Sequence, residues 1–270
     1  MGTAAAQFTV GSKEISSVFQ NELALDPSKA ASAPVSYVIA HFPYGGGWSS
    51  RVMVANNSSS ASATVDVIFY NQAGAGFSVP LEGQGLQATQ HLVIPPKQVK
   101  VFGATLNQRN VGNLQVAWAT VNTTSPVNVF SLFDFGTATS INGAVGAQST
   151  APAKSFRFPV SVGGPLGYNA GMAIANSSGT ATTVQVNVLN ADGTVKGSFQ
   201  ETLQQGNQQE IFVLTAKGIA FNLATVFDGT VVVCATQPIG LTTVGFEGGQ
   251  AYFTTSVTNE ACTGQGGLSP

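Results

Sequence analysis

Two stretches of this chain repeat each other in the same order, at an offset of about 119 residues, and this repeat constrains the fold more than any single motif does. Residues 52–56 (VMVAN) return as 172–176 (MAIAN), and residues 63–67 (ATVDV) return as 182–186 (TTVQV). Because many positions match in one order, each copy is expected to fold into the same unit. The 270 residues suffice for two ordinary domains.

The limits of the two copies predict how the chain is organised. We expect an N-terminal arm at 1–39, a first domain at 40–150, a linker at 151–154, a second domain at 155–258 and a C-terminal tail at 259–270. The linker is short, so the two domains are expected to lie close together.

Each copy has the pattern of β-strands separated by turns. Residues 184–188 alternate valine with polar side chains, which is the period of two expected for a half-buried strand. Asp192-Gly193 follows this run and favours a hairpin turn, because both residues tolerate a positive φ. No alternation of strand and helix patterns is present. The predicted fold class is all-β, with two tandem antiparallel β-sandwich domains.

Four motifs of the first copy resemble those of a known family: 42–43 (FP), 47–48 (GW), 54–65 (VANN…ATV) and 94–102 (IPP followed by VKVF). Most of them have partners in the second copy. Together they resemble the tandem immunoglobulin-like β-sandwich repeats of bacterial secreted and cell-surface proteins. The resemblance covers roughly residues 40–258. It implies spacers, assembly units or adhesion modules, and it brings no catalytic motif.

The chain is poor in charge. Charged residues make up 8% of it, against about 25% in typical soluble domains, while 43% of the residues are hydrophobic. The net charge is -2 without a basic stripe, so nucleic acid is not an expected partner. A surface with little charge favours association with further copies or a partner. It is equally typical of an ordinary secreted protein with a Ser/Thr-rich surface.

Membrane insertion is not expected, since no run of 18 or more apolar residues occurs. Residues 1–6 show neither the charged region nor the apolar region of a signal peptide. Residues 4–6 (AAA) look like a cleavage-site remnant, or equally like a cloning scar. The expected location is extracellular or at the cell surface, with the signal peptide removed.

No constellation of residues predicts a reaction. The two histidines, His41 and His91, are not in a metal-binding spacing, and the twelve carboxylates are scattered. The nucleophile elbow Gly-x-Ser-x-Gly is absent from the sequence. We therefore expect no catalytic residues, no metal and no cofactor, and we predict that the protein is not an enzyme.

The loop from Tyr44 to Trp48 is the candidate for contact with a ligand or partner. Two aromatic side chains bracket three glycines there, an arrangement that can present rings to a sugar or to a protein. The alternative is that Trp48 closes one end of the core. Tyr168 stands at the equivalent position of the second copy, and this favours the packing role.

The two cysteines are Cys234 and Cys262. In the run 114–118, the even-numbered positions, Trp118 included, are expected to face the core. The run 229–235 aligns with this stretch, and the alignment leaves Cys234 on the outer face of its strand. Because Cys262 follows the last strand, the tail is predicted to fold back and form a disulfide, which suits an oxidising compartment. The alternative is two free thiols.

The N-terminal arm lies outside the repeat and is the candidate for assembly. Phe8 and Val10 alternate as in a strand, whereas Ile15, Val18, Phe19 and Leu23 recur at helical spacing. Such an arm can add to an exposed sheet edge of a neighbouring copy.

Two functions follow as hypotheses. The first is a non-enzymatic structural subunit of an extracellular or cell-surface assembly, a filament, sheath or surface layer, that self-associates through sheet edges and the arm. Its partner is then another copy of the chain. The second is an adhesion module that binds a glycan or another surface protein.

Overall fold

The computed structural model of the chain describes residues 9–10, 13–14, 35–104, 112–137, 139–253 and 262. Within these residues every strand pairing is antiparallel, and the one helical element is a short 3-10 turn, η2 (Val213–Thr215). The all-β class predicted from the alternation of side chains is therefore confirmed. In the same part of the chain there is no helix with the length and hydropathy needed to cross a bilayer.

The first unit contains two four-stranded sheets. One sheet has the order β3 (Val35–Tyr44), β10 (Gln115–Thr123), β5 (Ala63–Asn71), β8 (Thr89–Ile94). The other has the order β12 (Ile141–Gln148), β11 (Val127–Gly136), β4 (Trp48–Asn56), β9 (Val99–Gly103). A small hairpin, β6 (Val79–Leu81) with β7 (Gly85–Gln87), precedes β8, and the pair β1 (Thr9–Val10) with β2 (Lys13–Glu14) lies N-terminal to this unit.

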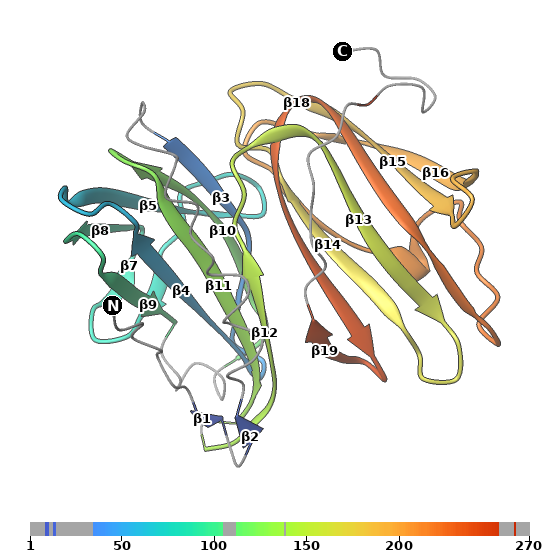
Figure 1. The fold of residues 1–270 in the computed structure, drawn as a ribbon, viewed down its shortest axis with the longest axis horizontal. Coiled ribbons are helices and arrows are strands. Elements are labelled where there is room, and N and C mark those ends of the chain that lie inside the picture. Colours follow the sequence, from blue (N-terminus) through green and yellow to red (C-terminus); the bar gives the residue numbers. More distant parts are fainter. Residues whose placement is uncertain are drawn as a thin grey trace.

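The second unit repeats this order with one long strand in place of two (Figure 1). The first part of β18 (Val226–Glu247) lies between β13 (Ala153–Gly163) and β15 (Thr182–Asn190), with β16 (Val195–Leu203) at the edge. The later part lies between β19 (Gln250–Phe253) and β14 (Asn169–Ala175), with β17 (Gln208–Phe212) at the edge. Thus β18 takes the places of both β10 and β11.

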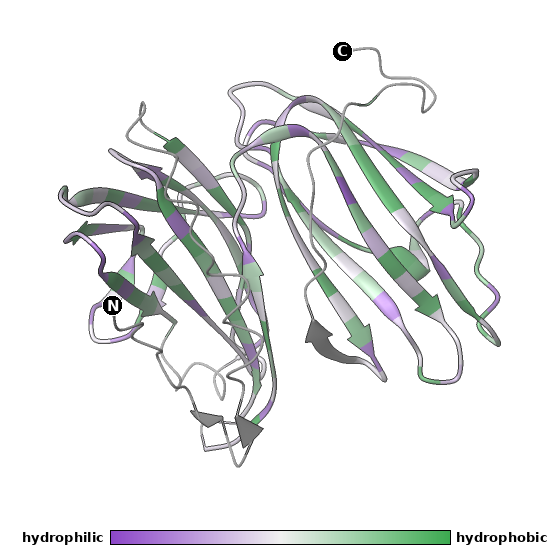
Figure 2. Cartoon of the chain, viewed as in Figure 1, coloured by the Kyte–Doolittle hydropathy of each residue, from purple (hydrophilic) through white to green (hydrophobic). Residues whose placement is uncertain are grey.

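Each unit buries one apolar core between its two sheets. The alternating side chains of β5 and β15 supply the centre of each core, and they are buried in both units: Val65, Val67, Phe69, Val184, Val186, Val188. Strands β4 and β14 close the same cores from the facing sheet. Figure 2 shows hydrophobic residues along the strands of both units and hydrophilic residues in many of the turns. Burial of this apolar surface is the main force that holds each unit together.

One asparagine fixes the same turn in both units. The amide nitrogen of Asn56 donates to the carbonyl oxygens of Ala61 and Ile94, at 2.8 and 2.9 Å. Its equivalent, Asn176, donates to the carbonyl oxygens of Thr180, Leu203 and Gln204. Both side chains are buried, so each satisfies backbone groups that water does not reach.

Some strands begin earlier than the predicted limits. Strand β3 starts at Val35, within the stretch assigned to the arm, and β13 starts at Ala153, within the stretch assigned to the linker. Of the arm residues singled out from the sequence, Val10 lies in β1. The others lie outside the described residues: Phe8, Ile15, Val18, Phe19, Leu23.

The predicted orientation of β10 is wrong. Val67 pairs with Val121 and its equivalent Val186 pairs with Val233, so Val121 rather than Val116 corresponds to Val233. Trp118 accordingly points away from the core of its own unit. The cause is that β10 is apolar on both faces, because the outer face is also buried, against the second unit. Alternation alone cannot tell two such faces apart.

Candidate functional site: the contact between the two units

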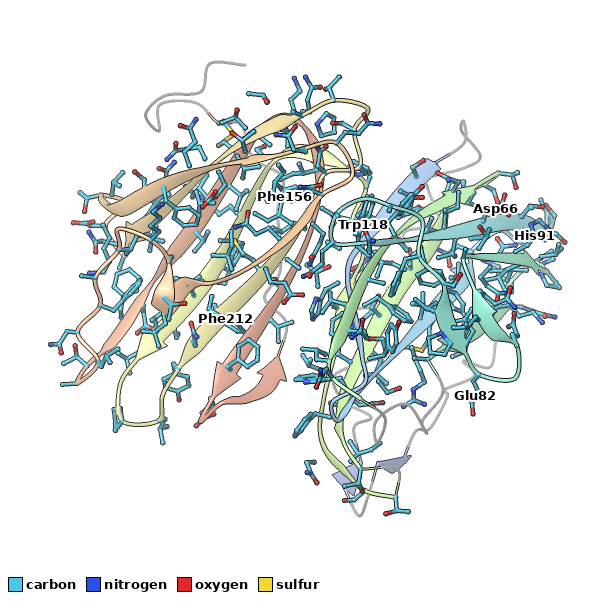
Figure 3. All side chains as sticks on the ribbon, turned by 180° about the vertical axis from the view of Figure 1, so that it is seen from behind. Asp66, Glu82, His91, Trp118, Phe156 and Phe212 are labelled. Atoms are coloured by element: carbon cyan, nitrogen blue, oxygen red, sulfur yellow. A yellow bond between two sulfur atoms is a disulfide. The ribbon has the colours of Figure 1, made fainter. Side chains whose placement is uncertain are left out.

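The two units meet through an apolar cluster centred on Trp118. Trp118 is buried, and its ring stacks on Tyr70 with centroids 4.5 Å apart and an interplanar angle of 22°. Its Nε1 donates a hydrogen bond to the carbonyl oxygen of Asn71, at 3.0 Å. The small side chains of Ala173 and Ala175 on β14 complete the contact from the second unit. Figure 3 shows Trp118 at the boundary between the units.

Glycines allow the two backbones to approach closely beside this cluster. A Cβ at Gly240 in β18 would overlap the side chain of Val38 in β3. A Cβ at Gly74 would lie 2.7 Å from the carbonyl carbon of Gly206, and both of these glycines have a positive φ. The backbone N–H of Gln208 donates to the carbonyl oxygen of Gln72 at 2.9 Å, so the units share a hydrogen bond as well as apolar surface.

A histidine and a carboxylate meet across the same boundary. His41 Nδ1 in β3 and Glu210 Oε1 in β17 are 3.0 Å apart. Burial raises the pKa of Glu210, but the neighbouring imidazole of His41 and amide of Gln208 lower it by more, so the pKa lies below its ordinary value. Next to this pair, Gln72 Nε2 donates to Gln208 Oε1 at 3.1 Å.

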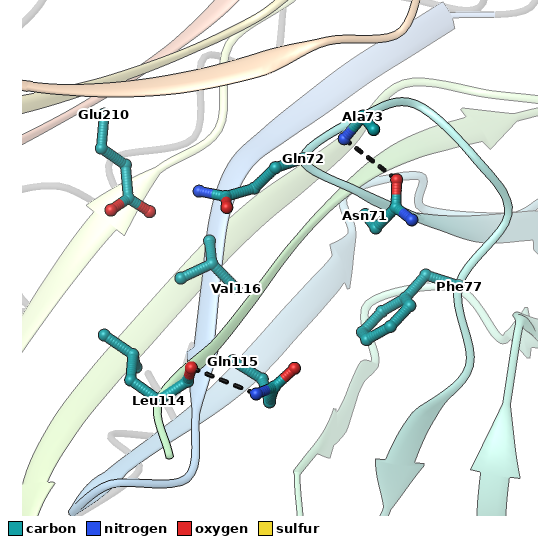
Figure 4. Close-up of a pocket in the computed structure, with 8 residues that line it drawn as sticks. All are labelled: Asn71, Gln72, Ala73, Phe77, Leu114, Gln115, Val116 and Glu210. Carbon is teal, nitrogen blue, oxygen red and sulfur yellow. Dashed lines mark hydrogen bonds between the residues drawn. The ribbon is translucent and has the colours of Figure 1, made fainter.

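An open groove of about 560 Å³ lies at the mouth of this contact (Figure 4). Its lining comes from the end of β5 and the loop that follows it, from the start of β10 and from β17: Asn71, Gln72, Ala73, Phe77, Leu114, Gln115, Val116, Glu210. Asn71 Oδ1 accepts hydrogen bonds from the N–H groups of Ala73 and Ala75, both at 3.0 Å. The amides and the single carboxylate of the lining offer hydrogen bonds to a neutral polar ligand. Among the described residues of the lining there is no serine, cysteine, threonine or lysine.

The aromatic residues of the 44–48 loop are in packing contacts. Tyr44 is buried in the core of the first unit, and burial raises the pKa of its hydroxyl. Trp48 is half-buried, and its ring centroid lies 5.2 Å from that of Phe135. The three glycines between them all have a positive φ, which makes the turn that reverses the chain.

The predicted disulfide is confirmed. Cys234 in β18 and Cys262 are bonded, with their Cα atoms 5.9 Å apart. Val233 is in the core whereas Cys234 packs with Leu189 and Val232 on the opposite face of the sheet, as expected. The bond ties Cys262 to that face of the sheet.

Two further contacts between ionisable side chains were not anticipated from the sequence. Arg51 Nη2 lies 3.2 Å from Asp134 Oδ2, and the carboxylate is completely buried. His91 and Asp66 form a pair at 2.6 Å at the exposed edge of the first unit (Figure 3). Among the described residues, no three His, Cys, Asp or Glu side chains come together as metal ligands.

The sequence analysis missed the residues of the contact. Trp118, Tyr70 and the pair His41–Glu210 come from segments far apart in the chain, and no local spacing relates them. The one available signal was that both faces of the run 115–121 are apolar, which indicates a strand covered on both sides.

No family model matches the chain, and no curated protein matches it.

Proposed function

We propose that this protein is a non-enzymatic structural subunit of an extracellular or cell-surface assembly, built from two immunoglobulin-like sandwich repeats, whose copies associate through exposed sheet edges. Two four-stranded antiparallel sheets around one core in the first unit, and the same strand order around one core in the second, where β18 serves both layers, support the immunoglobulin-like description. The disulfide between Cys234 and Cys262 supports an oxidising, extracellular location.

The observation that carries the proposal is that, among the strands the structure describes, two sheets end in unpaired edges at equivalent places in the two units. Strand β8 ends one sheet of the first unit, and β16 ends the corresponding sheet of the second. Each carries a solvent-exposed valine, Val93 at 54% and Val195 at 53% exposure. An open edge offers unpaired N–H and C=O groups to a strand of another copy. Two such edges on one molecule allow an extended assembly.

Size-exclusion chromatography with light scattering, followed by negative-stain imaging, tests this proposal. The unmodified chain is expected to form concentration-dependent oligomers or filaments. Val93→Lys and Val195→Lys place a charge at each edge and are expected to weaken the association. Leu223→Lys is the matched control, because Leu223 is 60% exposed and lies outside the strands. A chain that stays monomeric at high concentration contradicts the proposal.

An adhesion role is the alternative, and the groove favours it. A cleft of this size, with Gln72, Gln115 and Glu210 beside Phe77, offers hydrogen bonds and one aromatic ring to a glycan or a short protein segment. Glycan-array binding that is lost in Gln115→Ala, with an unchanged melting temperature, supports this role. Absence of binding to glycans and to surface proteins rejects it.

A further inference from the structure

The carboxylate in the groove at the unit boundary keeps one oxygen available to a ligand. Glu210 receives both of its contacts within the protein at Oε1, from His41 Nδ1 at 3.0 Å and from Gln208 Nε2 at 3.5 Å. Among the described residues no donor reaches Oε2. The side chain is 32% exposed, and Figure 4 shows the carboxylate pointing from β17 into the groove. A donor brought by a ligand therefore finds a free acceptor there.

The amides of the lining add further acceptors. Gln72 Nε2 already donates across the boundary at 3.1 Å, and Gln115 Nε2 donates to a neighbouring carbonyl oxygen at 3.3 Å. Neither of the two amide oxygens accepts a hydrogen bond from a described residue. Figure 4 shows the amide of Gln72 turned toward the carboxylate of Glu210, with Val116 beside them. One end of the groove thus presents two open acceptors at a short apolar floor.

This end of the groove also carries a negative charge. Glu210 is the one ionisable residue among the described residues of the lining. Burial raises the pKa of Glu210, but the contacts with His41 and Gln208 lower it by more, so the carboxylate is ionised at neutral pH. A neutral ligand uses the amides alone, whereas a cation also uses the carboxylate. A primary ammonium group suits such a surface, because it has three N–H donors, no acceptor and a positive charge.

We propose that the groove binds the ammonium group of an amino sugar, with Glu210 Oε2 as its counter-ion and Gln72 Oε1 as a second acceptor. This names the ligand class for the adhesion role and rests on that role. It is independent of the proposed assembly through the edges β8 and β16. Because β17 of the second unit supplies Glu210 and the first unit supplies the rest of the lining, the site requires the two units to be in contact.

An amino sugar uses more of the lining than a lysine side chain does. Asn71 Oδ1 accepts two backbone hydrogen bonds, while Nδ2 of the same amide donates to no described residue. A sugar hydroxyl can accept from this Nδ2 and donate to Gln115 Oε1. Val116 and Leu114, the latter 46% exposed, offer apolar contact to the C–H groups of a sugar ring. A lysine side chain brings the ammonium group and no hydroxyl.

Isothermal titration calorimetry of the full chain with two matched sugars tests the proposal. The probes are the β-1,4-linked tetramer of glucosamine and its N-acetylated form, which has the same skeleton without the positive charges. In slightly acidic buffer, where the sugar amines are protonated, the glucosamine tetramer is expected to bind about tenfold more tightly or better. This comparison needs no variant, so it holds even if a substitution at the boundary disturbs folding.

A variant pair locates the site. Glu210→Gln keeps the shape of the side chain and removes its charge, so it is expected to weaken binding of the glucosamine tetramer about tenfold or more and to leave binding of the acetylated tetramer unchanged. Glu82→Gln removes an exposed carboxylate between β6 and β7 and is the matched control, which is expected to change neither affinity. In hydrogen exchange of the unmodified chain, the glucosamine tetramer is expected to slow amides of residues 71–77 and 114–116 and to leave residues 89–94 unaffected.

Each contrary result overturns a stated part of the proposal. Equal affinity for the two tetramers, or unchanged binding in Glu210→Gln, removes the ammonium site. A lysine tetrapeptide that binds as tightly as the glucosamine tetramer removes the choice of an amino sugar. If the ammonium preference fails while other glycans bind in the array, the adhesion role stands and this inference falls. If no glycan and no surface protein binds, both fall.

Discussion

Gly240 of β18 lies directly against Val38 of β3, so closely that a single added carbon at position 240 would overlap the valine side chain. The two residues are about 200 positions apart in the chain and belong to different units. Their contact means that the units are held in one arrangement by packing as well as by the short connection between them. The absence of a side chain at position 240 is therefore required by a residue of the neighbouring unit.

Gly240→Ala is expected to destabilise the protein by separating the two units. Overpacking of a close contact typically costs about 1–3 kcal/mol in the free energy of unfolding, which urea denaturation measures. Gly179→Ala is the matched control, because a Cβ there meets nothing within 4 Å. An equal effect of the two substitutions would contradict the role assigned to Gly240.

Trp118→Ala is expected to lower the free energy of unfolding by about 3–5 kcal/mol, the usual range for removal of a buried tryptophan. The substitution removes the stacking on Tyr70 and the hydrogen bond to the carbonyl oxygen of Asn71. Trp118→Phe keeps an aromatic ring and loses only the hydrogen bond, so it is expected to cost less. If both variants unfold like the unmodified chain in urea, Trp118 does not hold the units together.

The pair His41–Glu210 is expected to make stability depend on pH in the acid range. The folded pKa of Glu210 is lowered, so its contribution is fully present above the ordinary value of 4.5 and is lost as the pH falls through the folded pKa. Glu210→Gln is expected to flatten this part of the curve of melting temperature against pH. Glu82→Gln alters an exposed carboxylate of the first unit and is the control. Identical curves for Glu210→Gln and the unmodified chain would rule out the pair.

Removal of the disulfide is expected to cost about 3 kcal/mol, as estimated for a closed loop of this length. The bond joins residues 28 positions apart. The double variant Cys234→Ala with Cys262→Ala avoids a free thiol, and its unfolding in urea is compared with that of the unmodified chain. Mass spectrometry after alkylation without reductant provides the direct check. Alkylation of both cysteines under those conditions would show that the bond does not form.

The sequence by itself determined the β-class and the presence of two equivalent units, and it favoured the disulfide over two free thiols. The alternation of valine in β5 and β15 shows which side chains enter each core, because a strand places successive residues on opposite faces. Cys234 was also placed outside its core, although the alignment with 114–118 used for this was out of register, since Val121 and not Val116 corresponds to Val233. The alternation within a strand is a local property of the sequence, and the repeat shows it in both copies.

Only the tertiary structure decided what covers the outer faces of the sheets. The orientation of Trp118, the fit of Gly240 against Val38 and the pairing of His41 with Glu210 depend on how one unit packs on the other. The pattern of β10 was ambiguous because both of its faces are buried, one in each of two different contacts. Packing between distant segments follows from the shapes of whole surfaces, and no spacing within a single strand records it.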